Sequence, residues 1–205
     1  MNKQIDVIYK QAQESDGLIT TKEIEGLGIG RYNIKDYVSE GLLVRESKGI
    51  YSVAKEMPDE YAVIQKRSQK AIYSYGTALY FHGLSDRVPR TIDVTLPQGY
   101  NASRLKKANP DLRIHYVQPD VLNLGVEELK TPQGSMVRAY NKERCICDLI
   151  KNQKRVDKQV FTQAIKTYFS GAYNPRAIIK IPTSMGNRAR VYRMTRTGCS
   201  DLRRG

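Results

Sequence analysis

Apolar residues near the start of the chain recur with the spacing of an amphipathic helix. They lie three or four positions apart: Ile5, Ile8, Tyr9 and Ala12. This pattern predicts a helix over residues 3–13 with one buried stripe. The dipeptide Asp16-Gly17 is a turn signal, and we expect it to end this helix.

A second helix is predicted to start at Thr20. Thr20 and Glu23 have the spacing of a capping box, in which the hydroxyl accepts from the N3 amide and the carboxylate accepts from the N-cap amide. Ile19 and Ile24 occupy the positions of a hydrophobic staple, so two start signals agree. The helix should be short, because three glycines follow it: Gly26, Gly28 and Gly30.

A third helix and a hairpin complete this N-terminal pattern. The helix is predicted to begin near Arg31 and to bury a stripe formed by Ile34, Tyr37 and Val38. The segment EGLLVRESKGIYSVA, residues 40–54, then places two apolar runs around a Lys-Gly turn, as in a β-hairpin. Helix, helix, turn, helix and hairpin is the element order of a winged helix-turn-helix.

The remainder of the chain mixes strand and helix signals. After a linker, AKEMPDEY, Pro58 is predicted to take the first position of a helix that ends near Ser68. Alternation with period two predicts three strands: 91–96, 112–117 and 135–140. Helix signals predict four further helices: Ser74 to His82, 142–152, Asp157 to Gly171 and one from Asn174-Pro175. The fold class is therefore α+β, with a winged helix-turn-helix over 1–57 and a larger C-terminal domain, 58–205, of a small sheet and helices.

The charge of the chain indicates a polyanionic partner. The net charge is +13, although residues 1–57 carry 8 Lys and Arg against 9 Asp and Glu, a balance of −1. Residues 58–182 carry 20 against 11, or +9, and residues 183–205 carry 6 against 1, or +5. Net charge alone thus does not mark the N-terminal domain as the DNA-binding part, whereas its local pattern does.

In a winged helix, the third helix enters the major groove with its first turns foremost. Arginine can bind guanine and asparagine can bind adenine through two hydrogen bonds each. Wing cations would meet phosphate, and threonines at a helix start could donate to phosphate. The predicted DNA-binding residues are Thr20, Thr21, Arg31, Tyr32, Asn33, Lys35, Arg45 and Lys48. Winged helices also serve as protein-docking modules, and the acidic Asp36 and Glu40 do not favour DNA.

Three segments resemble AbiEi antitoxins, the antitoxin half of the bacterial AbiE abortive-infection system. They are GLITTKEIEGLGIGRYNIKDYVSEGLLVRESKGIYSV, SYGTALYFHGLSDRVPRTIDVTLPQG and YNKERCICDLIK with its Glu-Arg-x-x-x-Asp pattern. The resemblance covers about residues 5–180. It departs from the family pattern in the basic tail 186–205, where the family usually continues with helices.

The resemblance implies a cytoplasmic, non-enzymatic antitoxin of the type IV class that protects against phage. Its N-terminal domain would bind inverted repeats in the promoter of its own operon and repress it, as a monomer that binds DNA cooperatively. Its C-terminal domain would counteract an AbiEii-like nucleotidyltransferase toxin without a stable complex.

Basic residues of the C-terminal part form four groups that could serve this antitoxin role. They are Lys66, Arg67 and Lys70; Arg87 and Arg90; Arg104, Lys106 and Lys107; and Lys151, Lys154, Arg155 and Lys158. They could extend the DNA footprint or compete with a nucleotidyltransferase for an anionic substrate such as RNA. They could also be a solvated surface without such a role.

Few side chains offer catalytic or metal chemistry. Cys145 and Cys147 lie two positions apart on a helix and point to different sides, so we interpret them as core thiols. His82 and His115 lack the glutamate spacing of zinc proteases. Asp93 stands alone in TIDVT, where a nucleotidyltransferase would use Asp-x-Asp to hold two metals. We expect no enzyme activity, no cofactor and no metal.

Two alternatives remain beside the antitoxin. A ligand-responsive winged-helix transcriptional regulator would need a roomy apolar pocket with a few polar groups. An enzyme acting on nucleotides would need paired carboxylates, which the sequence does not offer. The compartment is predicted to be the cytoplasm, because no apolar run approaches ~18 residues, no secretion signal is visible, and three cysteines make no disulfide framework.

Overall fold

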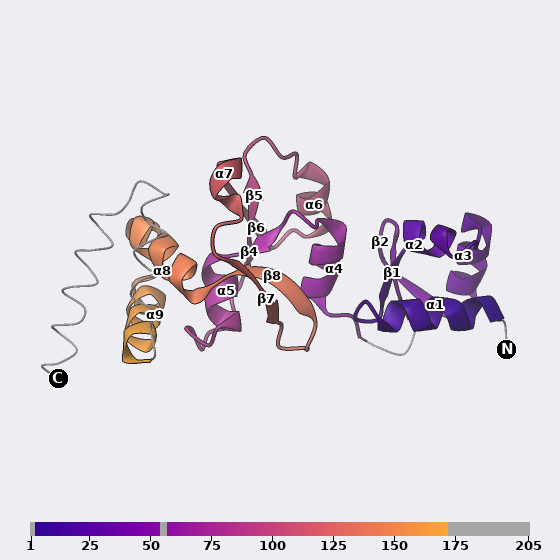
Figure 1. Cartoon of the computed structure of the whole chain (residues 1–205), viewed down its shortest axis with the longest axis horizontal. Helices are drawn as coiled ribbons and strands as arrows, with labels where there is room; N and C mark the ends of the chain where they lie inside the picture. The colour runs from indigo at the N-terminus through magenta and orange to yellow at the C-terminus, as the bar shows by residue number, and fades with distance from the viewer. Residues whose placement is uncertain (1–2, 54–56, 172–205) are drawn as a thin grey trace, which may run out of the picture. The chain divides into compact units, whose positions relative to one another are not determined.

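The computed structural model describes residues 3–53 and 57–171, apart from the side chain of Arg155 (Figure 1). The chain divides into two compact units. The first holds the residues up to Gln69 together with Lys130–Val137, and the second holds Lys70–Leu129 and the residues from Arg138 onward. The predicted helix from Asn174 and the basic tail 186–205 lie outside the described residues. The division into functional domains 1–57 and 58–205 stays a prediction.

The first unit contains the predicted winged helix-turn-helix. Its elements in order are α1 Lys3–Gln13, β1 Leu18–Thr20, α2 Thr21–Gly26, α3 Arg31–Ser39, β2 Leu43–Ser47 and β3 Ile50–Val53. The strands form an antiparallel sheet in the order β1-β3-β2, so the wing gains a third strand that the sequence pattern did not predict. In Figure 1 the helices α1, α2 and α3 lie together at one side of these strands.

Local signals explain why these helices begin and end where they do. Thr20 accepts a hydrogen bond from the Glu23 amide at 3.2 Å, and the Glu23 carboxylate accepts from the Thr20 amide at 2.7 Å. The predicted capping box is thus confirmed. Gly41, which follows α3, has a φ of 70°, a conformation that glycine adopts at little cost.

One core holds the three helices and the wing together. The predicted stripes of α1 and α3 supply half of its buried residues, and the wing adds Leu43 and Val53 from its two strands. The fully buried members are Ile8, Ala12, Ile19 and Ile24. Burial of such side chains stabilises a small domain by about 1.5–3 kcal/mol each.

The next helix, α4, begins later than predicted. It spans Glu60–Arg67, and its N-cap is Asp59, whose carboxylate accepts from the Tyr61 amide at 2.9 Å. The prediction that Pro58 opens this helix is therefore wrong, because the buried Asp59 caps it and also accepts a hydrogen bond from the hydroxyl of Thr131. Ala62 of α4 packs on Leu18 and Ile50 of the winged-helix sheet.

A five-stranded mixed sheet has the order β6-β5-β4-β8-β7. Its strands are β4 Ile72–Tyr73, β5 Ile92–Pro97, β6 Leu112–Val117, β7 Val126–Lys130 and β8 Met136–Tyr140. The predicted strands are confirmed within one residue at each end, and β4 was missed because two residues are too few to show alternation. Strands β5 and β6 run parallel with Asp93 opposite Arg113 and Thr95 opposite His115.

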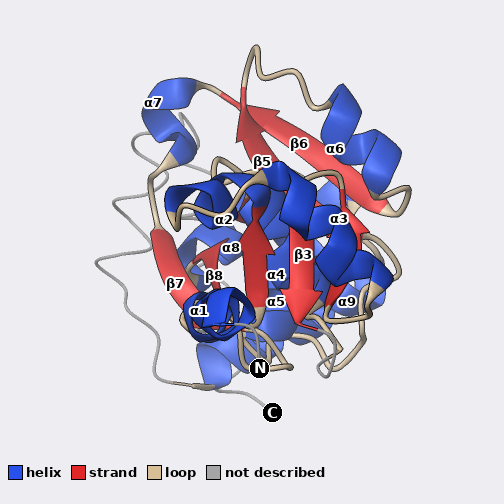
Figure 2. Cartoon of the chain, turned by 90° about the vertical axis from the view of Figure 1, so that its right-hand side faces the viewer, coloured by secondary structure: helices blue, strands red, loops and turns tan. Residues whose placement is uncertain are grey.

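Helices flank this sheet. They are α5 Tyr75–Phe81, α6 Ser103–Ala108, α7 Pro119–Leu122, α8 Lys142–Lys151 and α9 Lys158–Ser170, with a 3-10 turn at Gln153–Arg155 between the last two. Figures 1 and 2 both show β5 and β6 between α6 and α7, two short helices that the sequence pattern did not reveal. The predicted caps Asn141 and Asp157 are confirmed, since each accepts a backbone amide hydrogen bond in the first turn of its helix.

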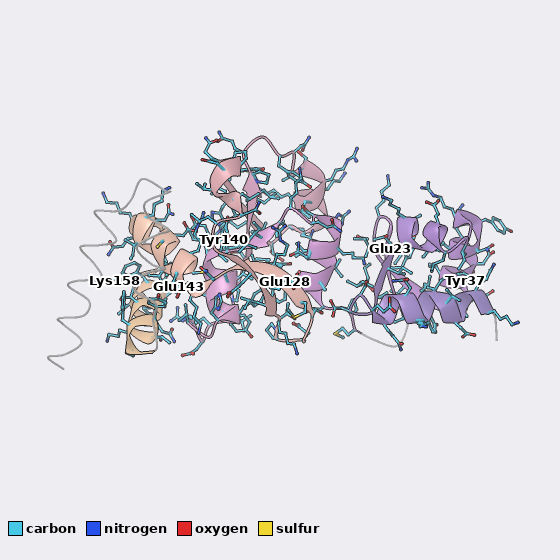
Figure 3. The ribbon with its side chains drawn as sticks, viewed as in Figure 1. Glu23, Tyr37, Glu128, Tyr140, Glu143 and Lys158 are labelled. Carbon is cyan, nitrogen blue, oxygen red and sulfur yellow. The ribbon has the colours of Figure 1, made fainter. Side chains whose placement is uncertain are left out.

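A buried ion pair lies at the centre of the second unit. Arg144, fully buried on α8, donates to the Asp148 carboxylate at 3.0 Å and to the Val121 and Leu124 carbonyls at 3.0 Å each. Its guanidinium lies 4.3 Å from the centre of the Tyr140 ring. Figure 3 labels Tyr140 and Glu143, between which β8 ends and α8 begins. The pair therefore ties α8 to the α7 segment and to the end of the sheet.

No helix within the described ranges is long and apolar enough to cross a membrane.

Candidate nucleic-acid interface

The exposed face of α3 carries most of the predicted base-reading residues. Burial of Ile34 and Tyr37 against the core turns the opposite side of the helix outward. Arg31, Tyr32 and Lys35 are exposed there, and Tyr32 is 76% exposed. Asp36 lies on the same face, so this surface holds two cations and one carboxylate.

Arg31 does not extend freely from this face. Its guanidinium is bound to the carboxylate of Glu25, the last acidic residue of α2. The hydrogen bond and the charge of Glu25 raise the pKa of Arg31, which stays cationic. The side chain of Arg31 is nevertheless 75% exposed, so water screens this ion pair strongly. Binding of a phosphate or a guanine edge would therefore compete with Glu25.

Asn33 has a different environment from its neighbours. It is half-buried, and its Nδ2 lies 3.4 Å from Oε1 of Gln4 on α1. The hydroxyl of Tyr37, labelled in Figure 3, donates to the same Oε1 at 2.9 Å. The amide of Asn33 thus faces α1 in this structure, and its predicted role in reading adenine would require this contact to be released.

Thr20 and Thr21 lie where α2 begins. The Thr20 hydroxyl is fully used, because it accepts from the Glu23 amide and donates to the Glu23 carboxylate at 2.9 Å. Thr21 donates its backbone amide to the Gly49 carbonyl at 3.0 Å. Gly49 is the second residue of the wing turn and has a φ of 78°. A backbone hydrogen bond therefore joins the turn of the wing directly to the start of α2.

The wing presents its two predicted cations to solvent. Arg45 on β2 and Lys48 in the turn are both exposed. The β2–β3 register shifts between Arg45 and Ser47, so a bulge bends the strand just before the turn. The anchoring of Gly49 to Thr21 fixes where Lys48 lies relative to α2.

Lys66, one of the predicted basic residues, is not a free surface cation. Lys66 of α4 is bound to Glu23 at 2.8 Å and its side chain is only 17% exposed. Partial burial raises the pKa of Glu23, but hydrogen bonds from Lys66 and Thr20 outweigh burial and lower it below its usual value. Lys66 is therefore a structural partner of the capping box, whose Glu23 is labelled in Figure 3.

The other predicted basic residues lie at the surface of the described part, and Arg67 is half-buried among them. Exposed are Lys70, Arg87, Arg90, Arg104, Lys106, Lys107, Lys151, Lys154 and Lys158. The side chain of Arg155 is outside the described residues. Arg104, Lys106 and Lys107 share the short helix α6, while Arg87 and Arg90 lie on the loop before β5. Arg113, which sequence reasoning missed, joins the second set because β6 pairs with β5.

His82, Cys145 and Cys147 occupy structural positions. His82 is nearly buried, and its Nε2 lies 2.8 Å from the carbonyl of Tyr140; since a carbonyl only accepts, Nε2 carries the proton. Burial lowers the pKa of His82. Cys145 and Cys147 are both buried, and burial raises the pKa of Cys147 to about 12. Within 3–53 and 57–171, no group of three or more His, Cys, Asp or Glu is placed to hold a metal ion.

Asp93 is buried beside His115. The carboxylate lies 2.8 Å from Nε2 of His115 and 3.9 Å from Nε of Arg113. Its backbone amide donates to the Thr77 hydroxyl at 2.8 Å. The residues of this cluster are some twenty positions apart in the sequence. The parallel pairing of β5 with β6 brings them together.

Comparisons with known proteins bear on the winged helix first. Residues 8–54 match the family model of the transcriptional regulators described as AbiEi antitoxin, a span that runs from within α1 to the end of the wing. A search of curated proteins found no match. Among solved structures, the crystal structure of the RV2827C protein from Mycobacterium tuberculosis is similar, with a TM-score of 0.60 and 13% identity over 89% of this chain and 72% of that chain.

The structural likeness shows a shared fold alone, since the sequences are too different to carry function. The family match is of another kind, because it rests on sequence and covers the element order of the winged helix. The predicted resemblance is therefore confirmed over residues 8–54, where the chain matches the model of the transcriptional regulators described as AbiEi antitoxin.

Proposed function

We propose that the chain is an antitoxin that represses its own operon by binding promoter DNA through α3 and the wing. The observation that supports this most directly is the exposure of Arg31 and Lys35 on α3 and of Arg45 and Lys48 on the wing. The Thr21–Gly49 hydrogen bond holds the wing turn against the helix-turn-helix, as a preformed DNA reader requires. Helix α3 would enter the major groove, and the wing would contact the sugar-phosphate backbone.

The charge of this domain supports cooperative binding to inverted repeats. Residues 1–57 have a balance of −1, and Glu25 already neutralises part of Arg31. Affinity that does not depend on sequence comes from neutralised phosphates, so one module would bind weakly. Two modules on adjacent half-sites would add their free energies, which suits a monomer that assembles on its operator.

The direct test measures binding of the full chain to DNA from upstream of its own gene. Arg31→Ala and Lys48→Ala should each weaken binding several-fold and reduce its salt dependence. Lys10→Ala removes an exposed cation of α1 outside the proposed surface and is the matched control. Unchanged affinity in both test variants would remove the proposed interface.

The C-terminal part, residues 58–205, is proposed to counteract a nucleotidyltransferase-like toxin in the bacterial cytoplasm without a stable complex. The resemblance of the segments Ser74–Gly99 and Tyr140–Lys151 to AbiEi antitoxins supports this role. The exposed cations of α6 could compete for the anionic substrate of the toxin. Replacing Arg104, Lys106 and Lys107 together by glutamate should then abolish protection in cells that express the toxin. Full protection by that variant would exclude this route.

A second candidate function is a transcriptional regulator that responds to a ligand. A cleft of about 990 Å³ in the second unit supports it, since a sensor needs such a volume. It differs from the first candidate in a simple genetic test. A ligand-responsive regulator would not protect cells against the toxin, whereas an antitoxin would.

A further inference from the structure

The cleft of the second unit has the size of a small-molecule site. Its volume is about 990 Å³, and it lies over the face of β5 and β6 that carries Asp93, Arg113 and His115. Residues of α5, of α8 and of the start of α9 complete its walls. Ligand pockets commonly measure about 300–1,000 Å³.

The charged groups of the cleft favour an anion. Arg87, Arg90 and Arg113 line it, and the side chain of Arg113 is 61% exposed. The two carboxylates that line it already have partners inside the protein. Asp93 binds His115 at 2.8 Å, and Asp157 accepts from the Gln159 and Val160 amides at the start of α9. Arg113 lies 3.9 Å from Asp93, and Arg87 donates to the side-chain carbonyl of Gln159. All three arginines are nevertheless exposed, so their guanidinium groups are the charges that a ligand can reach.

Several contacts hold the side chains on the floor of the cleft. Tyr75 has a φ of 44°, a strained conformation for a residue with a side chain. Its hydroxyl accepts from Nδ2 of Asn152 at 2.9 Å, and its ring stacks on His115 with centroids 4.1 Å apart. A side chain at Gly76 would approach Oδ2 of Asp93 to 3.1 Å, so glycine lets α5 pack closely on β5. The structure holds the His115 ring and the Asp93 carboxylate in place before any ligand arrives.

An apolar wall faces this charged floor. It comes from Leu79 on α5, Leu149 on α8, Val156 just before α9 and Val160 in its first turn. At the rim, Val88 is 66% exposed although it is a large aliphatic residue. A ligand that fits the cleft should therefore combine several negative charges with an uncharged, mostly flat or apolar part.

We propose that this cleft binds a small phosphorylated ligand of the nucleoside phosphate class. Three guanidinium groups are more than a ligand with a single carboxylate would need to balance its charge. Arginine also binds phosphate oxygens through paired hydrogen bonds. The phosphates contact Arg87, Arg90 and Arg113, and the nucleoside lies against the aliphatic wall. This inference does not depend on DNA binding by the winged helix.

Titration calorimetry of the full chain at constant ionic strength tests the proposal. The probes are sodium pyrophosphate and ATP, with adenosine as the uncharged comparison. We expect pyrophosphate and ATP to bind and adenosine to bind at least about tenfold more weakly. Arg113→Ala and Arg90→Ala should each weaken ATP binding by about tenfold, the loss of one charge-assisted contact. Arg113→Lys should restore part of it.

Arg104→Ala is the matched control, because Arg104 is equally exposed on α6 and does not line the cleft. Its ATP affinity should equal that of the wild type. The proposal is overturned if neither pyrophosphate nor ATP binds, if all three arginine-to-alanine variants lose affinity equally, or if an RNA oligonucleotide alone binds. None of these readouts involves promoter DNA, so failure here leaves the proposed repressor function intact.

Discussion

At the scale of single residues, the environment of a side chain decides what its charge can do. Arg31 and Lys66 look alike in sequence as cations near helix ends. In the structure Arg31 is an exposed cation held by Glu25, whereas Lys66 is largely buried against Glu23. The first keeps an exposed charge for the proposed contact with DNA, and the second stabilises the fold.

The Glu25–Arg31 contact yields a prediction on DNA affinity. Glu25→Gln removes a negative charge from the proposed interface and releases Arg31. We expect tighter promoter binding, with a salt dependence steeper by up to about one counterion, in fluorescence anisotropy titrations at several salt concentrations. Glu14→Gln makes the same charge change away from α3 and should alter neither quantity. Equal behaviour of the two variants would contradict the assigned surface.

The buried His82 yields a prediction on pH. Burial lowers its pKa in the folded chain, so the unfolded chain takes up a proton first as the pH falls below about 6.5. Stability from the neutral imidazole is therefore present above that pH and is lost as the pH decreases. Urea unfolding between pH 7.5 and 5.5 should show this loss. His82→Gln keeps a donor for the Tyr140 carbonyl and should flatten the profile; an unchanged slope would show that His82 is not responsible.

At the scale of elements, caps and strand pairing explain where the helices and strands lie. The capping box of Thr20 and Glu23 starts α2, and the caps Asn141 and Asp157 start α8 and α9. Helix α4 begins after the cap Asp59 and not at Pro58. These devices act within a few residues, so sequence patterns reveal most of them. The start of α4 was missed because the second partner of Asp59, Thr131, lies far along the chain.

Loss of the capping box should weaken α2 locally. Thr20→Ala removes the hydroxyl that accepts the Glu23 amide, and such losses typically cost about 1 kcal/mol. Hydrogen exchange of the α2 amides should accelerate about fivefold. Thr20→Ser keeps the hydroxyl and serves as the control, with exchange close to that of the wild type. If alanine leaves exchange unchanged, the cap does not stabilise this helix.

At the scale of the whole molecule, the second unit depends on a buried charge network. Burial raises the pKa of Asp148, and the adjacent Arg144 guanidinium opposes that shift. The same guanidinium reaches two carbonyls near α7, so one side chain joins α8, the α7 segment and Tyr140. The Glu-Arg-x-x-x-Asp pattern of the sequence thus has a structural purpose in this chain.

Removal of one partner should cost more than removal of both. Arg144→Met leaves a buried carboxylate without its cation, which typically costs about 3–5 kcal/mol. Arg144→Met combined with Asp148→Leu should lose less than the single variant in urea unfolding monitored by circular dichroism. A single variant within about 1 kcal/mol of the wild type would show that the pair is dispensable.

The sequence by itself determined the winged helix, because its signals are local: a capping box, apolar stripes of period 3.6 and a Lys-Gly turn each act within a few residues. Exposure of Arg31, Lys35, Arg45 and Lys48 followed from the same periodicity. Only the tertiary structure decided which distant residues meet. Register between β5 and β6 brings Asp93 to Arg113 and His115, and α4 brings Lys66 to Glu23. Such pairings depend on how elements pack, which no short stretch of sequence encodes. The cleft, and the addition of Arg113 to the predicted pair Arg87 and Arg90, therefore came from the fold alone.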